Sequence, residues 1–108
     1  GDGNQTRDFT FVENVVAANL CCCAAPESSA GSVCNIGCGD RISINDLADR
    51  LAAIMGRKIK ATHDAPQKGD VRDSQADISR AGQLIRWTPR VDLDAGLRKT
   101  VEWFLKNG

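Results

Sequence analysis

Four stretches of the chain carry apolar residues at helical spacing, and three of them begin beside a residue that can cap a helix. These residues are Ser43, Asp77 and Asp92, whose side-chain oxygens can accept hydrogen bonds from the free backbone N–H groups of a first helical turn. The clearest stretch follows Asp92, and its apolar residues are Leu93, Leu97, Val101, Phe104 and Leu105. The sequence therefore predicts a fold rich in helices, the last of which runs up to Gly108.

The two middle helices have equally definite limits. Ser43 is followed by Asp46 in the position of the acidic partner of a capping box, and Gly56 supplies the glycine that commonly ends a helix. The next helix must end near Trp87, because Pro89 disfavours helical geometry in the residue before it. Each helix is thus expected to stop at a residue that cannot easily continue it.

The first helical stretch runs from Glu13 to about Ala25. Its small and apolar residues are nearly continuous, which is typical of a helix buried on most sides. Pro26 and the Ser- and Gly-rich residues 28–32 end it. We therefore expect this helix to lie inside the fold.

Three short segments have strand-like patterns: residues 7–12, 33–36 and 58–62. Residues 64–70 are rich in turn formers and are expected to form a loop. The chain has 108 residues, 42% of them apolar, which is enough to bury one modest core. The sequence therefore predicts a single domain, residues 1–108, with an α/β fold that has a small sheet of about three strands and four helices.

The charge balance argues against several classes of partner. Fourteen Lys and Arg residues match fourteen Asp and Glu residues, so the chain lacks the long-range field that draws proteins to nucleic acid or anionic membranes. The longest mainly apolar run, residues 15–25, is shorter than the roughly 20 residues that a membrane helix needs. The amino terminus does not resemble a signal peptide. We expect a cytoplasmic protein that binds neither nucleic acid nor membranes.

The five cysteines do not suggest a disulfide framework or a metal site. Their number is odd, and Cys21 to Cys23 are adjacent. Cys34 and Cys38 are spaced Cys-x-x-x-Cys, but a structural zinc site needs four ligands and the only histidine is His63. We expect reduced, buried thiols and no bound metal.

Four short motifs follow one another along the chain. They are Gly1 to Phe9 with Val12 to Val15, then Asn35-Ile36-Gly37, then Gly69 to Ser74 with Ala76 to Ser79, and finally Trp87-Thr88-Pro89. In this order and spacing they resemble the carboxy-terminal part of the extended short-chain dehydrogenases, the NAD-dependent epimerase/dehydratase proteins, and most closely the UDP-sugar 4-epimerases. The similarity spans nearly the whole chain.

This resemblance implies an enzyme of two parts. In the family, an amino-terminal Rossmann domain binds NAD, which oxidises a sugar hydroxyl and returns the hydride to the opposite face, and a Tyr in a Tyr-x-x-x-Lys motif is the base. The present chain has no Tyr, and Gly1-x-Gly3 precedes a predicted strand, whereas a dinucleotide-binding turn follows one. We therefore expect these residues to bind no cofactor and to be inactive alone, although the complete enzyme would use NAD.

The resemblance also assigns two principal substrate contacts. Arg7 matches the Arg that pairs with the diphosphate, for which a guanidinium offers paired donors; the alternative is a surface Arg paired with Asp8. Asp70 matches a residue at the nucleotide site, where a carboxylate can accept hydrogen bonds from ribose hydroxyls or orient a basic group. Its alternative is a turn residue after Gly69. Asp8 is expected to be structural, and Phe9 to lie in the core.

Three further residues complete the predicted substrate site. Gln67 stands where the family usually has a second phosphate-binding Arg, so a charge is missing there, and Lys68 or Arg72 is a candidate to compensate for it. Ser74 falls where epimerases commonly place a substrate-contacting side chain, although a solvent-exposed hydroxyl would explain it equally well. The predicted substrate-binding residues are therefore Arg7, Asp70, Gln67, Ser74 and Arg72, with no catalytic, cofactor or metal residue among them.

Two functions stay open at this point. The first is the nucleotide-sugar-binding part of an NAD-dependent UDP-sugar 4-epimerase-like enzyme. The second is a stand-alone, non-catalytic interaction or structural module that kept the fold, which Gln67 and the absence of Tyr favour. Under the first, an apolar surface that would face the cofactor domain is uncovered, so we expect a homo-oligomer or a partner that covers this surface.

Overall fold

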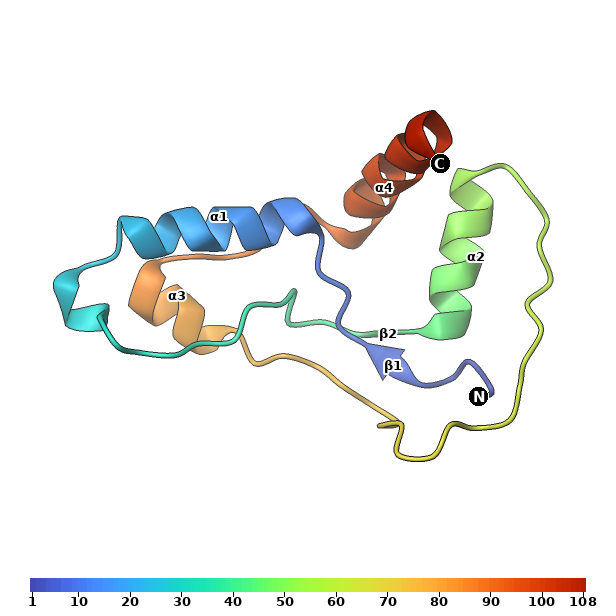
Figure 1. Cartoon of the computed structure of the whole chain (residues 1–108), viewed down its shortest axis with the longest axis horizontal. Coiled ribbons are helices and arrows are strands. Elements are labelled where there is room, and N and C mark those ends of the chain that lie inside the picture. The colour runs from blue at the N-terminus through green and yellow to red at the C-terminus, as the bar shows by residue number, and fades with distance from the viewer.

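The computed structural model describes all residues, 1–108, and places α1 and α3 at one end, α2 and α4 at the other, and a short sheet between them (Figure 1). The predicted number of four helices is confirmed, and none of them combines the length and apolarity that a membrane crossing requires. The elements are β1 (Thr6–Arg7), α1 (Val12–Cys23), a 3₁₀ turn (Glu27–Ser29), β2 (Ile42–Ser43), α2 (Ile44–Ile54), α3 (Ser79–Ile85) and α4 (Leu93–Asn107).

The predicted caps hold the starts of α2 and α4. The Ser43 hydroxyl oxygen accepts a hydrogen bond from the Asp46 N–H at 3.0 Å, and the Asp92 carboxylate accepts one from the Ala95 N–H at 2.7 Å. Gly56 follows the end of α2 with a φ of +64°, a backbone conformation that glycine adopts without a steric cost. These three local signals therefore acted as predicted.

Helix α3 begins slightly later than predicted. Its N-cap residue is Ile78 rather than Asp77. The Asp77 carboxylate still secures the start of the helix, because its Oδ1 accepts hydrogen bonds from the Ser79 N–H at 3.0 Å and from the Ser79 hydroxyl at 2.7 Å. The Asp therefore supports the first turn from one position further out.

The prediction of about three strands is wrong. The sheet has two strands, in which β1 pairs antiparallel with β2 so that Thr6 lies opposite Ser43 and Arg7 lies opposite Ile42. Residues 33–36 and 58–62 form no strand, and the backbone of 33–36 makes no hydrogen bond to another backbone group. A strand exists only where a second strand satisfies its N–H and C=O groups, and these segments have no such neighbour.

The first predicted strand, residues 7–12, is much shorter in the structure. Phe11 has extended geometry and is the N-cap of α1, which already begins at Val12. Residues 8–11 therefore serve as a linker between β1 and α1. The alternating pattern in this segment matches its two surroundings, because Asp8 and Thr10 line one cavity and Phe9 and Phe11 line another.

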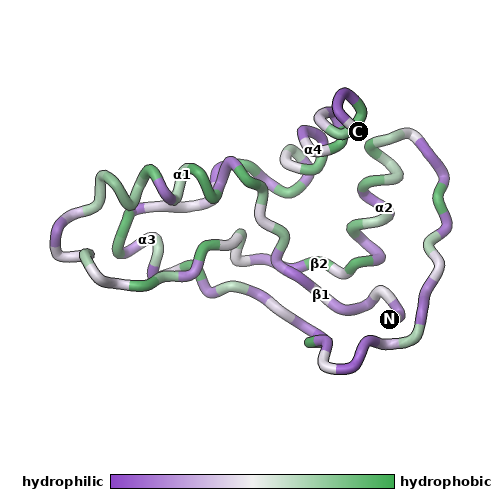
Figure 2. The backbone as a smooth tube through the Cα atoms, in the orientation of Figure 1, coloured by the Kyte–Doolittle hydropathy of each residue, from purple (hydrophilic) through white to green (hydrophobic).

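Most of the small core lies between α1 and α3, where Ala18, Ala81, Ile85 and Trp87 form one buried cluster. At the other end, Ala52 of α2 and Val101 of α4 are also buried. Much of α1 consists of hydrophobic residues (Figure 2). The expectation that the helix is buried on most sides is nevertheless wrong, because several of its apolar side chains are exposed, with Leu20 at 66%. The prediction of buried thiols also fails for Cys22 and Cys23, which are exposed, whereas Cys21 packs against the core. Only the side of α1 that meets α3 is covered.

The buried side chain of Asn14 joins α1 to the segment that precedes α4. Its Nδ2 donates a hydrogen bond to the Val91 carbonyl at 2.8 Å, and its Oδ1 accepts hydrogen bonds from the N–H groups of Arg90 and Val91, each at 3.0 Å. Its backbone carbonyl accepts a hydrogen bond from the Trp87 indole N–H at 3.0 Å. One residue thus fixes the path of the chain between α3 and α4.

Candidate functional site

Arg7 and Asp70 lie next to each other although they are 63 residues apart in the sequence. Nη2 of Arg7 donates to Oδ1 of Asp70 at 2.6 Å, in a pair whose side chains are 27% and 45% exposed. Strand β1 fixes the backbone of Arg7, and a turn in which the Asp70 N–H donates to the Gln67 carbonyl at 3.2 Å presents the carboxylate. The structure thus brings the two principal predicted residues together and pairs Arg7 with Asp70 rather than with Asp8.

Asp8 is structural, as predicted. Its carboxylate does not hold Arg7 but anchors two other parts of the chain, at residues 38–39 and at residue 76. Its carboxylate accepts hydrogen bonds from the N–H groups of Cys38 at 2.8 Å, Gly39 at 2.9 Å and Ala76 at 3.3 Å. A Cβ at Gly37 would lie 2.7 Å from Oδ2 of Asp8 and from Cβ of Ala76, so only glycine fits this approach. The carboxylate therefore joins the first motif to the third, at Ala76, and to Cys38 and Gly39, which directly follow the second.

Residues of these three motifs line a cavity of about 350 Å³ that is open to solvent. Ser74 and Arg7 both line it, so the structure also brings Ser74 into the neighbourhood of the principal pair. The complete lining is Arg7, Asp8, Thr10, Asn35, Ile36, Gly37, Ser74, Gln75 and Ala76. Polar groups of the wall, including the Ser74 hydroxyl, can donate to and accept from a polar ligand.

Gln67 and Arg72 are not part of this cavity wall. Arg72 is instead paired with Asp2, with Nη1 at 2.9 and 3.0 Å from the two carboxylate oxygens. Gln67 is exposed, and its backbone carbonyl closes the turn that leads to Asp70. Of the five predicted substrate residues, Arg7 and Ser74 therefore line the cavity, Asp70 reaches it through its pair with Arg7, and the side chains of Gln67 and Arg72 lie outside it.

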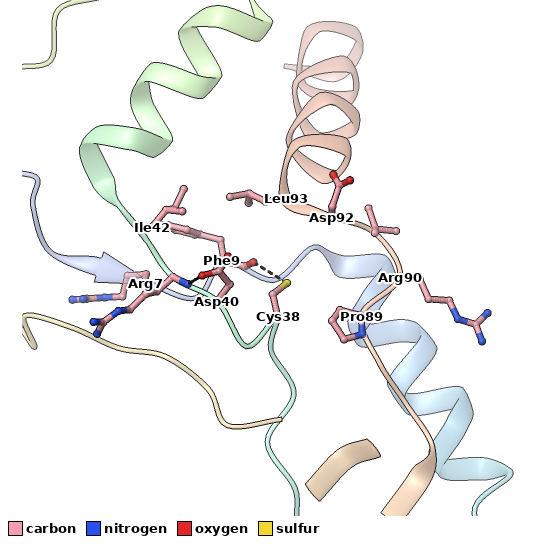
Figure 3. A pocket seen from close by; sticks show the side chains of 11 residues that line it. Arg7, Phe9, Cys38, Asp40, Ile42, Pro89, Arg90, Asp92 and Leu93 are labelled. Carbon is pink, nitrogen blue, oxygen red and sulfur yellow. Dashed lines mark hydrogen bonds between the residues drawn. The ribbon is translucent and has the colours of Figure 1, made fainter. Parts of the chain in front are cut away.

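A second cavity, of about 290 Å³, also has Arg7 in its wall (Figure 3). Phe9 lies on its wall and is only partly buried, which corrects the expectation that it belongs to the core. Cys38 also lies there, with its Sγ 3.3 Å from the Phe9 carbonyl (Figure 3). Burial, and then the negative charge of Asp8, raise the pKa of the Cys38 thiol, so this group stays protonated and is a poor nucleophile.

Sequence reasoning missed most of the wall of this second cavity. Ile42 comes from β2, Pro89 and Val91 come from the connection between α3 and α4, and Leu93 is the first residue of α4. In the sequence, Pro89 indicates only the limit of a helix, and Leu93 only the apolar face of one. No local pattern indicated that these segments meet, because the meeting depends on the buried bonds of Asn14.

The residues present do not fit a dinucleotide cofactor. Such a site needs a strand, a glycine-rich turn and the start of a helix in direct succession. Gly3 precedes β1, and a Cβ there would lie 2.1 Å from the Asn45 side chain, so its role is close packing in a turn. No group of three or more His, Cys, Asp or Glu side chains is arranged to hold a metal ion.

Known proteins with similar sequence include several epimerases of nucleotide sugars. The family model described as NAD dependent epimerase/dehydratase family matches residues 1–37. A UDP-glucuronate 4-epimerase of Thermodesulfobacterium geofontis is 34% identical over 108 residues, which are 99% of this chain and 32% of that protein. A putative UDP-glucose 4-epimerase of Methanocaldococcus jannaschii is 37% identical over 107 residues, 99% of this chain and 33% of that protein.

Solved structures show the same relation. The UDP-glucose 4-epimerase of Thermotoga maritima, crystallised with UDP-glucose, superposes with a TM-score of 0.90 at 39% identity, over 98% of this chain and 33% of that one. The chain thus spans about a third of the length of the proteins it matches. From its motifs, its fold and these similarities, the chain belongs to the NAD-dependent epimerase/dehydratase proteins of the extended short-chain dehydrogenase family and is UDP-sugar 4-epimerase-like.

Proposed function

We propose that this chain is the nucleotide-sugar-binding part of an NAD-dependent UDP-sugar 4-epimerase-like enzyme. The observation that carries the proposal is the meeting of Arg7 and Asp70, at 2.6 Å, beside a cavity that three family motifs enclose. A guanidinium suits a diphosphate because it combines a permanent charge with several N–H donors in one plane. A carboxylate suits ribose because its oxygens accept hydrogen bonds from hydroxyl groups.

The surrounding residues would complete the contacts. Ser74, on the cavity wall, offers a hydroxyl that can donate or accept. Arg72 would have to leave its exposed ion pair with Asp2 to take the role of the second Arg that the family has at Gln67. Lys68, an exposed residue of the same loop, is the cation available for that role. Because these residues fit no dinucleotide, the proposal assigns them substrate binding alone.

Titration of the chain with UDP and UDP-glucose tests this proposal. In a ¹H–¹⁵N correlation spectrum, we expect shifts concentrated at Arg7 and Asp70 and around the cavity wall, because the ligand would contact these groups directly. Uridine, which lacks the phosphates, should shift Arg7 much less. An unchanged spectrum at millimolar UDP-glucose would instead support the stand-alone interaction module.

The uncovered apolar surface suggests what the chain binds besides substrate. On α1 the exposed apolar residues are Val12, Val15, Val16 and Leu20. The unpaired extended residues 33–36 belong to the same end of the molecule, and Val33 is 75% exposed. In a complete enzyme of this family we propose that the cofactor-binding part covers this surface. When the 108 residues are alone, we propose that a second copy does so.

Sedimentation velocity tests whether a second copy of the chain covers this surface. We expect the sedimentation coefficient of the isolated chain to rise with concentration, because exposed apolar side chains are removed from water on association. The variant Val16→Glu places a charge on α1 and should reduce the association. Gln83→Glu adds the same charge to an exposed position of α3 and should leave it unchanged. A compact monomer at all concentrations would contradict the proposal.

A further inference from the structure

Most hydrogen-bond donors of Arg7 are already used within the protein. Nη2 donates to Asp70 at 2.6 Å, and Nη1 donates to the carbonyls of Thr6 at 2.7 Å and Arg72 at 3.4 Å. A guanidinium has five N–H donors, so these three bonds leave two. The two left are the Nε–H and one Nη2–H, so a phosphate that binds them side by side comes up against the Asp70 carboxylate, a like charge on the same Nη2.

Asp70 belongs to a segment that is attached to the molecule by polar contacts alone. We call residues 64–75 the strap; all of them are exposed, and they form neither a helix nor a strand. Asp73 accepts a hydrogen bond from the Thr6 hydroxyl at 2.7 Å, Arg72 pairs with Asp2 at 2.9 Å, and two backbone bonds join the strap to Thr6. No buried apolar side chain of the strap holds it in place.

Such a segment can open at little cost. Exposed ion pairs contribute little to stability because water and salt screen them. Segments with few buried contacts also open locally without unfolding the rest of the molecule. The position of Asp70 on Arg7 is therefore reversible, and a stronger anion can displace it.

We propose that Asp70 is an intramolecular competitor that occupies Arg7 until an anionic ligand arrives. The inference rests on the proposed function in that it takes Arg7 as the anion-binding group of the site. The entering phosphate takes the place of the carboxylate on Nη2, which removes a like charge from its neighbourhood and frees Asp70 to accept hydrogen bonds from another part of the ligand. Anion binding and release of the strap at residue 70 are thus one coupled event.

Two charge-neutralising variants of the strap test this inference. Asp70→Asn removes the charge that pairs with Arg7. Asp73→Asn removes the same charge from the same strap, but the Asp73 side chain contacts Thr6 and not Arg7. The probe is inorganic diphosphate, which has no sugar or base, and its dissociation constant is measured from amide shifts in the 108-residue chain. We expect Asp70→Asn to bind diphosphate about two- to fivefold more tightly than Asp73→Asn, the range of an exposed ion pair.

The Arg7→Gln substitution shows whether diphosphate binding depends on Arg7. Combined with each of the two strap variants, it should abolish the difference between their affinities for diphosphate. Equal affinities of Asp70→Asn and Asp73→Asn would overturn the inference, as would diphosphate binding that does not depend on Arg7 or that cannot be detected in any variant. Circular dichroism spectra that match the unsubstituted chain establish that each variant is folded.

The same experiment separates this inference from the proposed function. If diphosphate binds at Arg7 more tightly in Asp70→Asn, but UDP-glucose binds no better than diphosphate, the competitor is real and the nucleotide-sugar proposal fails. If UDP-glucose binds selectively, but the two strap variants have equal affinity for diphosphate, the site is real and Asp70 does not compete.

Discussion

The variant Asn14→Ala is expected to lower the free energy of unfolding by about 3 kcal/mol, through lost hydrogen bonds and a small cavity. The side chain is 1% exposed and makes three hydrogen bonds to the segment before α4. Alanine would leave the N–H groups of Arg90 and Val91 and the Val91 carbonyl without their partner. A chain of this size has a free energy of unfolding of only about 5–10 kcal/mol, so the loss would be a large fraction of the total.

Urea denaturation followed by circular dichroism measures this effect. Asn19→Ala is the matched control, because Asn19 lies on the same helix and is exposed. Alanine at position 19 should leave the midpoint unchanged or raise it slightly, since alanine favours helix more than asparagine does. Equal midpoints for Asn14→Ala and the unsubstituted chain would show that the buried amide does not hold α1 to the α3–α4 connection.

The second large effect is expected for Asp8→Ala, which should lower the free energy of unfolding by about 2–3 kcal/mol. The carboxylate is the shared acceptor for three backbone N–H groups, those of Cys38, Gly39 and Ala76. Because these groups lie in two segments of the cavity wall, the loss should also disorder the wall itself. The amides of Cys38 and Gly39 should then exchange with solvent hydrogen much faster than in the unsubstituted chain.

Asp40→Ala provides the comparison for this variant. Asp40 is exposed, and its carboxylate accepts one hydrogen bond, from the N–H of the next residue, Arg41. We expect its removal to cost less than about 1 kcal/mol and to leave the exchange at residues 38 and 39 unchanged. If the two aspartate variants had the same stability and the same exchange pattern, Asp8 would not be the anchor of the cavity.

The helices were predictable because their signals are local. A side-chain cap such as Ser43 or Asp92 acts on N–H groups two or three residues away, and a glycine such as Gly56 acts on the turn it belongs to. These effects need no information about the rest of the fold. The limits of α2 and α4 therefore follow from the sequence to within a residue or two.

Strands and burial were not predictable in the same way. Residues 33–36 have the composition of a strand, but a strand needs a second backbone to pair with, and in the structure no other backbone forms hydrogen bonds with these residues. The apolar pattern of α1 likewise indicates a surface that can be buried, without indicating which neighbour buries it. Only the side that meets α3 is covered, and Leu20 on the other side is exposed.

For the site, the sequence predicted the identity of the residues better than their arrangement. Arg7, Asp70 and Ser74 were selected by resemblance, and the structure places all three close to one cavity. The ion pair of Arg72 with Asp2 could not be predicted, because it depends on the path of the strap across β1. The anchoring of two distant segments by Asp8 is a tertiary feature for the same reason.

The binding of UDP-glucose to matched arginine variants tests the central claim most directly. Arg7→Gln removes the proposed diphosphate contact, whereas Arg41→Gln removes the same charge from an exposed arginine at the second cavity. We expect the unsubstituted chain and Arg41→Gln to show the same dissociation constant, and Arg7→Gln to bind at least about tenfold more weakly, as is typical for a lost charge-assisted hydrogen bond. Equal weakening by both substitutions, or none by either, would contradict the assignment of Arg7 to the phosphate groups of a nucleotide sugar.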